Sequence, residues 1–210
     1  MKTLITGSTG FIGKRLCIFL DLNKISIIGV SRKKQYSIQD SIVCDLKKEE
    51  IEEESLVGVD TVYHLAGYAH DLRNPDELKD EYYLTNVLAT INLAKTSARM
   101  GVKDFIFVSS VKAGLSDIYD RSSVETPEGI YGETKREAEL KLIEISKETD
   151  MKISIIRPSL VYGPSLKGNL ASMKKAIKAG WFPPIPKLNN KRSMIHVDDL
   201  VKAIVLVKQR

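Results

Sequence analysis

The 210-residue sequence predicts an α/β fold built on a doubly wound parallel sheet. Three observations support this prediction. Short apolar runs alternate with helical patterns along the chain, which is the order of elements in a parallel sheet covered by helices. The runs are continuous, as in Ile106-Phe107-Val108, which is typical of strands buried on both faces. A glycine-rich turn from Gly7 to Gly13 joins the first run to the first helical pattern.

The expected elements alternate through most of the chain. Strands are expected over residues 3–6, 26–30, 41–44, 61–64, 104–109 and 152–157. Helices are expected over residues 11–21, 78–100, 131–147, 170–179 and 198–208. Crossovers between parallel strands are right-handed, so the helices should cover both faces of the sheet.

The pattern changes after Arg157. Pro158, Gly163-Pro164 and the segment 181–184 (Trp-Phe-Pro-Pro) indicate irregular chain between the last helices. We therefore expect two parts. Residues 1–157 would form a dinucleotide-binding Rossmann domain, and residues 158–210 would form the start of a substrate-binding portion that is incomplete.

Composition and charge narrow the class of protein. Hydrophobic residues make up 43% of the chain, enough for a substantial core. The net charge of +5 fits either ordinary surface lysines or an anionic ligand such as a phosphorylated cofactor. Basic and acidic residues are interleaved, and no helix-turn-helix, zinc or RNA-binding motif occurs, so we expect no nucleic-acid partner.

Cysteine and histidine usage predicts no metal site. Cys17 and Cys44 have no metal-ligand spacing, and the three histidines are scattered. Met1-Lys2 leads directly into the first strand, and no apolar run reaches the about 18–20 residues needed to span a bilayer. We expect a cytoplasmic protein with reduced cysteines and no membrane partner.

The glycine turn predicts a dinucleotide-binding site. Gly7 permits the tight turn, Gly10 lets backbone N–H groups approach a pyrophosphate, and Gly13 lets the helix pack close to the sheet. The helix N-terminus offers N–H donors and the positive end of a dipole. The cofactor contacts predicted in this turn are Gly7, Thr9, Gly10, Phe11, Ile12 and Gly13.

The glycine spacing G-x-x-G-x-x-G resembles the extended branch of the short-chain dehydrogenase/reductase superfamily. That branch contains sugar-nucleotide epimerases, dehydratases and reductases, and its substrate-binding portion usually continues for about a hundred residues beyond the length of this chain. The resemblance extends over nearly all 210 residues, because several further motifs follow in the same order.

Tyr131 and Lys135 form a Y-x-x-x-K motif at the start of a predicted helix. Positions i and i+4 share one helical face, so the ammonium can stand near the phenol. A nearby positive charge favours the phenolate and lowers the pKa of the tyrosine, which could then exchange a proton with a sugar hydroxyl or carbonyl. The same spacing also occurs by chance on many helices. In the family that the chain resembles, the lysine binds the nicotinamide ribose.

Ser109 and Ser110 end the strand expected over 104–109, where a hydroxyl faces the ligand crevice. The resemblance implies that Ser110 is catalytic and polarises the reacting oxygen of the substrate, whereas Ser109 contacts the cofactor or caps local backbone. Family 4,6-dehydratases have an acidic pair next, but this chain has Val111-Lys112, which disfavours that activity. The segment is similar to UDP-glucose 4-epimerase-like bacterial proteins, a subgroup with UDP-4-keto-sugar reductases of surface polysaccharide assembly.

The resemblance implies further contacts. The segment His64–Gly67 is similar to the family's H-L-A-A loop, with His64 structural. Asn86 matches an asparagine that holds the active-site geometry. Arg192 would bind the substrate diphosphate, because a guanidinium binds phosphate bidentately, although it could equally be a surface residue. The remaining implied cofactor contacts are Asp45, Leu46, Leu65, Ala66, Gly67 and Pro158.

The end of the second strand bears on the choice of cofactor. NAD-binding proteins place a carboxylate there to bind the ribose 2′-hydroxyl. This chain has Ser31 and Arg32, followed by two lysines. We therefore favour NADP(H), with NAD(H) left open because Arg32 could instead stack on adenine.

Together these residues predict an NAD(P)-dependent oxidoreductase or epimerase acting at C4 of a nucleotide-activated sugar. The resemblance implies that this sugar is linked to UDP. The sequence does not separate an epimerase from a 4-keto reductase. A non-catalytic NADP(H)-binding sensor or scaffold, or an inactive truncated fragment, remains the alternative. By analogy with the family, a homodimer would pair through the helices 78–100 and 131–147.

Overall fold

The computed structural model describes residues 2–35, 38, 40–69, 78–114, 126–164, 169–181 and 193–208. Within these residues a parallel sheet has the strand order β3-β2-β1-β4-β5-β6. Its strands are β1 (Lys2–Thr6), β2 (Ser26–Ser31), β3 (Asp40–Val43), β4 (Val59–His64), β5 (Asp104–Val108) and β6 (Lys152–Ile156). The chain builds outward from β1 to β3 and then returns to β4 on the other side of β1. The predicted doubly wound parallel sheet is therefore confirmed.

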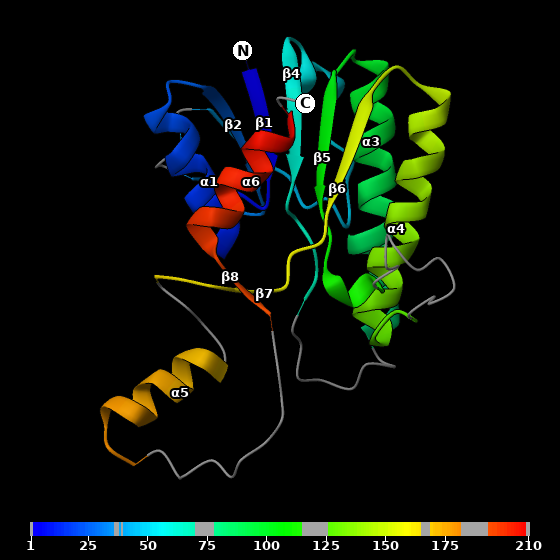
Figure 1. Cartoon of the computed structure of the whole chain (residues 1–210). Coiled ribbons are helices and arrows are strands. Elements are labelled where there is room, and N and C mark those ends of the chain that lie inside the picture. The colour runs from blue at the N-terminus through cyan, green and yellow to red at the C-terminus, as the bar shows by residue number, and fades with distance from the viewer. Residues whose placement is uncertain are drawn as a thin grey trace.

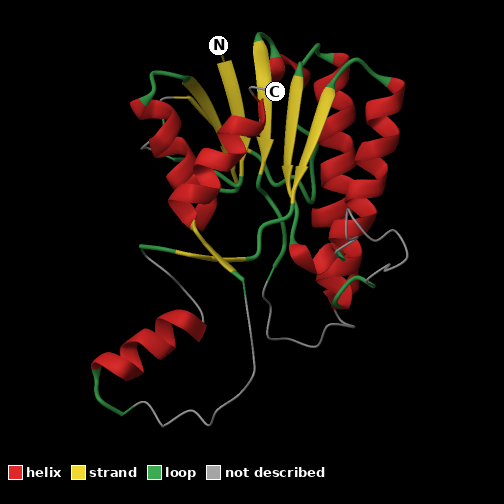
Figure 2. Ribbon diagram, in the orientation of Figure 1, coloured by secondary structure: helices red, strands yellow, loops and turns green. Residues whose placement is uncertain are grey.

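Helices cover both faces of this sheet (Figure 1). One face carries α1 (Phe11–Leu22) and α6 (Val197–Lys208), and the other carries α3 (Ala89–Arg99) and α4 (Gly129–Glu148). Figure 2 shows the same three layers, with the strands between two groups of helices. All strands point the same way, so their carboxyl ends meet at one edge of the sheet.

Alternating strand residues build two separate cores. Leu4 belongs to the cluster under α3 and α4, whereas the next residue, Ile5, belongs to the cluster under α1 and α6. The same alternation occurs on β5, where Phe105 and Phe107 face one way and Ile106 the other. Successive side chains of a strand point to opposite faces, so continuous apolar runs are needed in a sheet covered on both sides.

Helical backbone extends through nearly all of the segment expected as a helix over 78–100, but a π-turn interrupts its α-helical hydrogen bonding. The structure has a short helix α2 (Lys79–Tyr83), a π-helical turn η3 (Leu84–Leu88) and then α3. π-Turns are rare and frequently occur at functional sites. This one contains Asn86, a buried polar residue that hydropathy patterns do not reveal.

Short elements were also missed by the sequence prediction. Strands β7 (Leu160–Tyr162) and β8 (Met194–His196) pair in parallel to form a second, small sheet. Each has three residues, too few for a detectable pattern. The remaining elements are the 3₁₀ turns η1 (Glu53–Leu56) and η4 (Val111–Ala113) and the helix α5 (Asn169–Lys178).

Helix α6 packs on the sheet beside α1. Leu200, Val201 and Ile204 are buried in the same core as Leu16 and Leu20 of α1. Because α6 begins at Val197, Asp198 lies in its first turn, where it pairs with Arg15 of α1 at 2.6 Å. The division at residue 157 into two parts stays a prediction.

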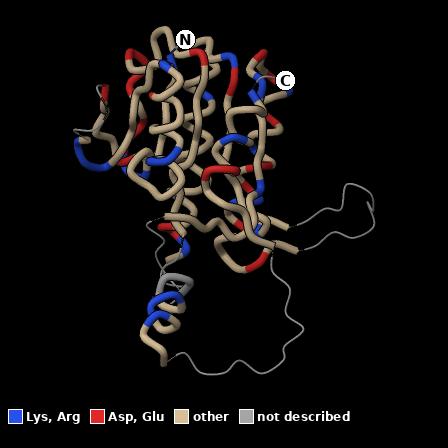
Figure 3. The backbone as a smooth tube through the Cα atoms, turned by 60° about the vertical axis from the view of Figure 1, so that its left-hand side comes forward, with Lys and Arg blue, Asp and Glu red and all other residues tan. Residues whose placement is uncertain are grey.

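Charged residues are mixed over the sheet and its covering helices. Lys and Arg lie among Asp and Glu along the backbone in Figure 3. Among the described helices, none is both long and apolar enough to cross a membrane.

Candidate active site

The turn between β1 and α1 depends on glycine at two positions. Gly7 has φ of 67°, and a Cβ on it would lie 2.7 Å from the Ala66 nitrogen. A Cβ on Gly13 would lie 2.2 Å from the Gly7 carbonyl oxygen, so α1 can pack this close only with glycine there. Gly10 precedes α1, and no side chain caps this helix. The first N–H groups of α1 are thus open to an anion such as a pyrophosphate.

The three other residues predicted in this turn lie beside those glycines. Thr9 is exposed, and Phe11 and Ile12 are half-buried in the first turn of α1. Leu65 and Ala66 continue from the end of β4 and border the turn, because the Ala66 nitrogen donates to the Thr6 hydroxyl at 3.1 Å. The carboxyl ends of β1 and β4 therefore meet where the strand order reverses, which is the usual ligand crevice of such sheets.

His64 is a buried structural residue at this edge. The Thr6 hydroxyl lies 2.6 Å from Nδ1 and the Thr90 hydroxyl 2.8 Å from Nε2. Thr90 donates its own proton to the Asn86 carbonyl oxygen at 2.8 Å, so it accepts from Nε2–H, and Thr6 donates to Nδ1. Burial and the neighbouring Lys135 lower the pKa of His64 to about 3, so the ring is neutral.

Asn86 ties the loop after β4 to helix α4. Its Oδ1 accepts from the Tyr68 nitrogen at 2.7 Å, and its Nδ2 donates to the Tyr68 carbonyl and the Thr134 hydroxyl, each at 3.1 Å. Gly67 lies in the same loop, and a Cβ on it would be 3.2 Å from Oδ1 of Asn86 and 3.8 Å from Nζ of Lys135. The loop, the π-turn and the start of α4 are thus joined by one side chain.

Lys135 is buried beneath this loop. Its Nζ donates to the Val108 carbonyl oxygen at 2.8 Å and lies 4.0 Å from the centroid of the Phe107 ring. Burial lowers the pKa of Lys135 to about 7, against the opposing effect of Glu139. A buried lysine with so low a pKa is expensive for folding and is characteristic of a functional site.

Tyr131 lies one helical turn before Lys135, next to Ser110. Burial raises the pKa of Tyr131, while the hydrogen bond between the two side chains of Tyr131 and Ser110 acts to lower it. The Tyr82 ring lies 6.5 Å from that of Tyr131. The prediction that Lys135 lowers the pKa of Tyr131 is wrong for this structure, because burial outweighs every favourable interaction of the phenol.

The two serines after β5 differ in their surroundings. Ser110 caps the turn η4 by accepting a hydrogen bond from the Lys112 nitrogen at 3.2 Å, and it presents its hydroxyl to Tyr131. Ser109 is buried, and its hydroxyl has no hydrogen-bond partner among the described residues. An unpartnered buried hydroxyl at this edge is suited to a ligand.

Gly132 brings α4 against the turn that carries Ser110. A Cβ on Gly132 would lie 2.1 Å from the Lys112 carbonyl oxygen. The same oxygen accepts a hydrogen bond from the Glu128 nitrogen at 2.8 Å. The glycine after the tyrosine therefore sets the spacing between Tyr131 and Ser110.

The end of β2 contains a small polar network. The Ser31 hydroxyl donates to the Lys33 carbonyl oxygen at 2.6 Å and accepts from Nε2 of Gln35 at 2.8 Å. Gln35 also donates to the hydroxyl of Ser8 in the glycine turn at 2.5 Å. The Ser31 hydroxyl therefore uses its one hydrogen-bond donor on the backbone, whereas the Arg32 side chain is exposed.

The remaining predicted residues are placed as follows. Asp45 and Leu46 follow β3 and are half-buried, with Leu46 packed against the core. Pro158 follows β6, and its carbonyl oxygen accepts from the Val111 nitrogen at 3.2 Å. Arg192 lies outside the described residues.

No group of three potential metal ligands occurs among the described residues. A surface hollow of about 480 Å³ is lined by residues at the opposite edge of the sheet, including Asp104 and Lys152 at the starts of β5 and β6. It is remote from the polar groups described above, so we assign it no role in the site.

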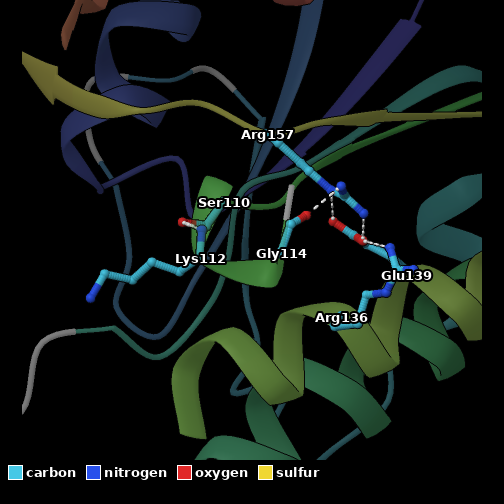
Figure 4. A network of polar contacts seen from close by, with 6 residues as sticks. All are labelled: Ser110, Lys112, Gly114, Arg136, Glu139 and Arg157. Carbon is cyan, nitrogen blue, oxygen red and sulfur yellow. Dashed lines mark hydrogen bonds and ion pairs between the residues drawn. The ribbon is translucent and has the colours of Figure 1, made fainter. Parts of the chain in front are cut away.

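An ion pair that the sequence did not predict lies beneath the site. Arg157 and Glu139 form a two-pronged pair between the end of β6 and α4, and the guanidinium also reaches Gly114 (Figure 4). The signal available was a glutamate on the apolar side of α4, four residues after Lys135. Thr134 and Gln35 were also missed, because their roles depend on contacts between distant parts of the chain.

The sequence matches the NAD dependent epimerase/dehydratase family over residues 3–210. It is 34% identical to a UDP-glucose 4-epimerase of Vibrio cholerae over 96% of this chain and 65% of that protein. It is 30% identical to the N-acetyl-alpha-D-glucosaminyl-diphospho-ditrans,octacis-undecaprenol 4-epimerase of Escherichia coli O157:H7, over 97% of this chain and 62% of that protein. The chain thus spans somewhat less than two thirds of the length of these relatives.

A solved structure has the same fold. MoeE5 in complex with UDP-glucose and NAD superposes with a TM-score of 0.83 at 26% identity, covering 98% of this chain and 71% of that one. A UDP-glucuronic acid 4-epimerase from Bacillus cereus, in complex with NAD, superposes with the same score at 21% identity, which shows the fold alone.

Proposed function

This chain belongs to the NAD dependent epimerase/dehydratase family, and we propose that it catalyses hydride transfer at C4 of a nucleotide-activated sugar. The observation that carries the proposal is the convergence of Ser110, Tyr131 and Lys135 at the carboxyl edge of the sheet. A protein that only binds a dinucleotide needs the glycine turn, but it does not need these three groups together.

The residues at this edge suit a nicotinamide dinucleotide. The glycine turn and the open N–H groups of α1 would hold the pyrophosphate. The Ser109 hydroxyl, which has no hydrogen-bond partner in the described part of the chain, and Lys135 would face the nicotinamide half. When bound, the cofactor supplies hydride transfer to or from the sugar carbon. The chain itself supplies the proton chemistry and the positions of the reacting groups.

Tyr131 would act as the acid and base of the reaction. Its phenolate would take the proton of the C4 hydroxyl as the hydride leaves that carbon, and its phenol would return a proton when the hydride comes back. Ser110 would hydrogen-bond the same substrate oxygen, in addition to supporting the phenolate. Lys135 would contribute positive charge beside the nicotinamide ribose once that contact offsets its burial.

The reaction that we propose is C4 epimerisation rather than the release of a reduced sugar. Support comes from the relatives in Vibrio cholerae and Escherichia coli, both of which are named 4-epimerases. A UDP-linked substrate is favoured because UDP-glucose is bound in MoeE5. A 4-keto reductase would use the same three residues in one direction only.

For the cofactor we propose that NADP(H) is accepted alongside NAD(H), with a preference for NADP(H). Residues 31–34 contain no carboxylate, and Arg32 is exposed at the end of β2, where it could meet a 2′-phosphate. The NAD bound in MoeE5 supports the other choice. Titration with NADPH and, separately, NADH tests this preference, and tighter binding of NADH would contradict it.

We also propose that two copies pair through α2 and α4. Tyr83 on α2 and Leu140 and Ile143 on α4 are exposed apolar side chains. Exposed apolar side chains that gather into one patch often mark a protein–protein interface.

The proposed function is tested by following UDP-glucose and its N-acetylhexosamine counterpart by NMR for inversion at C4. We expect turnover by the wild-type chain and a loss of at least about a thousandfold in the Tyr131→Phe variant, with unchanged cofactor binding. Tyr162→Phe, which alters an exposed tyrosine of β7, is the matched control. Equal turnover by wild type and Tyr131→Phe would contradict the proposal, and so would tight cofactor binding without any turnover.

A further inference from the structure

The pair of Arg157 and Glu139 lies directly behind the proposed catalytic residues. Nε of Arg157 donates to Oε1 of Glu139 at 2.9 Å, and Nη2 donates to Oε2 at 2.5 Å. The glutamate side chain is 1% exposed and the arginine side chain 22%. Arg136, one helical turn before Glu139, adds a weaker contact at 3.4 Å.

Such a pair is a poor device for stability alone. Removing two charges from water is unfavourable, and a buried ion pair often contributes no more than apolar side chains of similar size. We therefore look for the role of this ion pair in what it orients rather than in how much it stabilises the fold.

The third nitrogen of the guanidinium contacts the turn that the ion pair orients. Nη1 of Arg157 donates to the Gly114 carbonyl oxygen at 2.6 Å. Gly114 ends the turn η4, and Ser110 caps the start of that same turn. Figure 4 shows the guanidinium between the carboxylate of Glu139 and the turn that bears Ser110.

The chain around Arg157 holds the other end of the turn. The Ser109 nitrogen donates to the Ile156 carbonyl oxygen at 2.7 Å, and the Val111 nitrogen donates to the Pro158 carbonyl oxygen at 3.2 Å. The backbone on both sides of Arg157 thus binds the start of the turn, while its side chain binds the end.

We propose that Arg157, aligned by Glu139, is a positioning residue that holds the turn η4, and with it the Ser110 hydroxyl, against the start of α4 where Tyr131 lies. The inference rests on the proposed function for its catalytic meaning, but the contact chain from Arg157 to Tyr131 is a property of the folded protein. Arg157 touches neither Tyr131 nor the reacting atoms in this scheme, because it acts through Gly114 and Ser110.

The consequence is measurable at Tyr131 without substrate. The hydrogen bond from Ser110 opposes the rise that burial causes in the pKa of Tyr131. Loss of that bond should move the titration of Tyr131 to higher pH. Among the described residues, the other group that acts on the phenol is Tyr82 on α2, while Lys135 donates to the Val108 carbonyl oxygen and Lys112 on the turn pairs with Glu128.

The test uses the full chain with 3,5-difluorotyrosine at position 131, followed by ¹⁹F NMR over pH. This analogue titrates at lower pH than tyrosine, within the range where the protein stays folded. In Arg157→Lys, which keeps the charge opposite Glu139 but cannot make all three contacts, we expect the titration to move to higher pH, as in Ser110→Ala. Arg99→Lys, in an exposed pair with Glu53, is the matched control and should leave it unchanged.

A double variant separates positioning from a general structural role. If Arg157 acts through Ser110, Arg157→Lys should add no further shift in the Ser110→Ala background. We also expect kcat to fall roughly tenfold or more in Arg157→Lys, with cofactor Kd unchanged. A folded Arg157→Lys that titrates like wild type, or a shift that adds to that of Ser110→Ala, would overturn the inference.

A further variant, in which both partners of the ion pair are replaced, tests whether the shift could come from misfolding around an unpaired charge. Arg157→Met combined with Glu139→Gln leaves no buried unpaired charge and should show the same shift as Arg157→Lys. If wild type turns over no nucleotide sugar and yet these shifts are found, the proposed function fails and the positioning role stands. The reverse result, turnover that is unaffected by Arg157→Lys, sinks the positioning role alone.

Discussion

Lys135 is the residue whose environment departs furthest from that of an ordinary surface lysine. Its ammonium lies under the loop at Gly67, against the Phe107 ring and the Val108 carbonyl oxygen. In an unfolded chain the same group would be hydrated, with a pKa of about 10.4, and would therefore stay protonated up to a pH near that value. Folding lowers the pKa of Lys135 to about 7, because burial disfavours the charged ammonium. The protonated side chain therefore destabilises the native state.

Lys135→Met should therefore stabilise the fold while abolishing activity. We expect the free energy of unfolding at pH 7 to rise by roughly 1–2 kcal/mol, as measured by urea denaturation. Between pH 7 and about 10 the native wild type has lost its proton while the unfolded chain keeps it, so wild-type stability rises with pH. The advantage of Lys135→Met should shrink over that window. An advantage that stays constant from pH 7 to 10 would contradict the assigned protonation.

At the scale of elements, the junction between α4 and the turn η4 is the tightest contact of the site. Gly132 lies so close to the Lys112 carbonyl oxygen that any side chain must push the helix away. Tyr131 is fixed on the helix and Ser110 on the turn, so a displacement at Gly132 separates the two residues.

Gly132→Ala should consequently lower activity more than stability. We expect a destabilisation of about 1–3 kcal/mol and a loss in kcat of roughly a hundredfold, because small displacements of reacting groups have large effects on rate. Glu133→Ala, at the next and exposed position of α4, should change neither quantity appreciably. Thermal unfolding and steady-state kinetics on both variants measure the two effects. A kcat for Gly132→Ala within twofold of wild type would show that this contact does not set the geometry.

The sequence predicted elements well where a local pattern specifies them. The apolar runs from Ile106 and from Ile153 became β5 and β6, and the glycine turn lies where its spacing placed it. The π-turn at Asn86 was not predictable from the sequence. The Asn86 side chain makes its hydrogen bonds to Tyr68 and Thr134, which are 18 and 48 residues away.

The site was predictable to a similar extent. Ser110 and Tyr131 come together as the motifs imply, and Lys135 lies on the same helix. The protonation of these groups was not predictable, because it depends on burial. The ion pair of Glu139 and Arg157 joins residues that only the folded sheet brings together.

At the scale of the whole molecule, α6 is an integral part of the sheet's cover despite coming last in the described chain. Its buried face completes the core that α1 begins, and Asp198 pairs with Arg15 across the two helices. The sheet and α6 should therefore unfold together as one unit.

Substitution of two leucines of α6 should therefore have very different effects on the free energy of unfolding. Leu200 is 1% exposed, whereas Leu206 is 52% exposed. Leu200→Ala should destabilise the protein by about 3 kcal/mol, and Leu206→Ala by less than about 0.5 kcal/mol, in a single urea transition. Equal effects, or a separate early transition for α6, would show that this helix does not belong to the core.

The central claim is that Tyr131 and Ser110 mediate hydride transfer between a nucleotide sugar and a bound nicotinamide. The most direct measurement mixes the chain, saturated with oxidised cofactor, with excess UDP-glucose in a stopped-flow instrument and follows the near-ultraviolet absorbance of reduced nicotinamide. We predict a rise in absorbance that is lost in Tyr131→Phe while cofactor affinity is retained. An identical rise in Tyr131→Phe, or no rise in a wild-type chain shown to bind both molecules, would contradict the account.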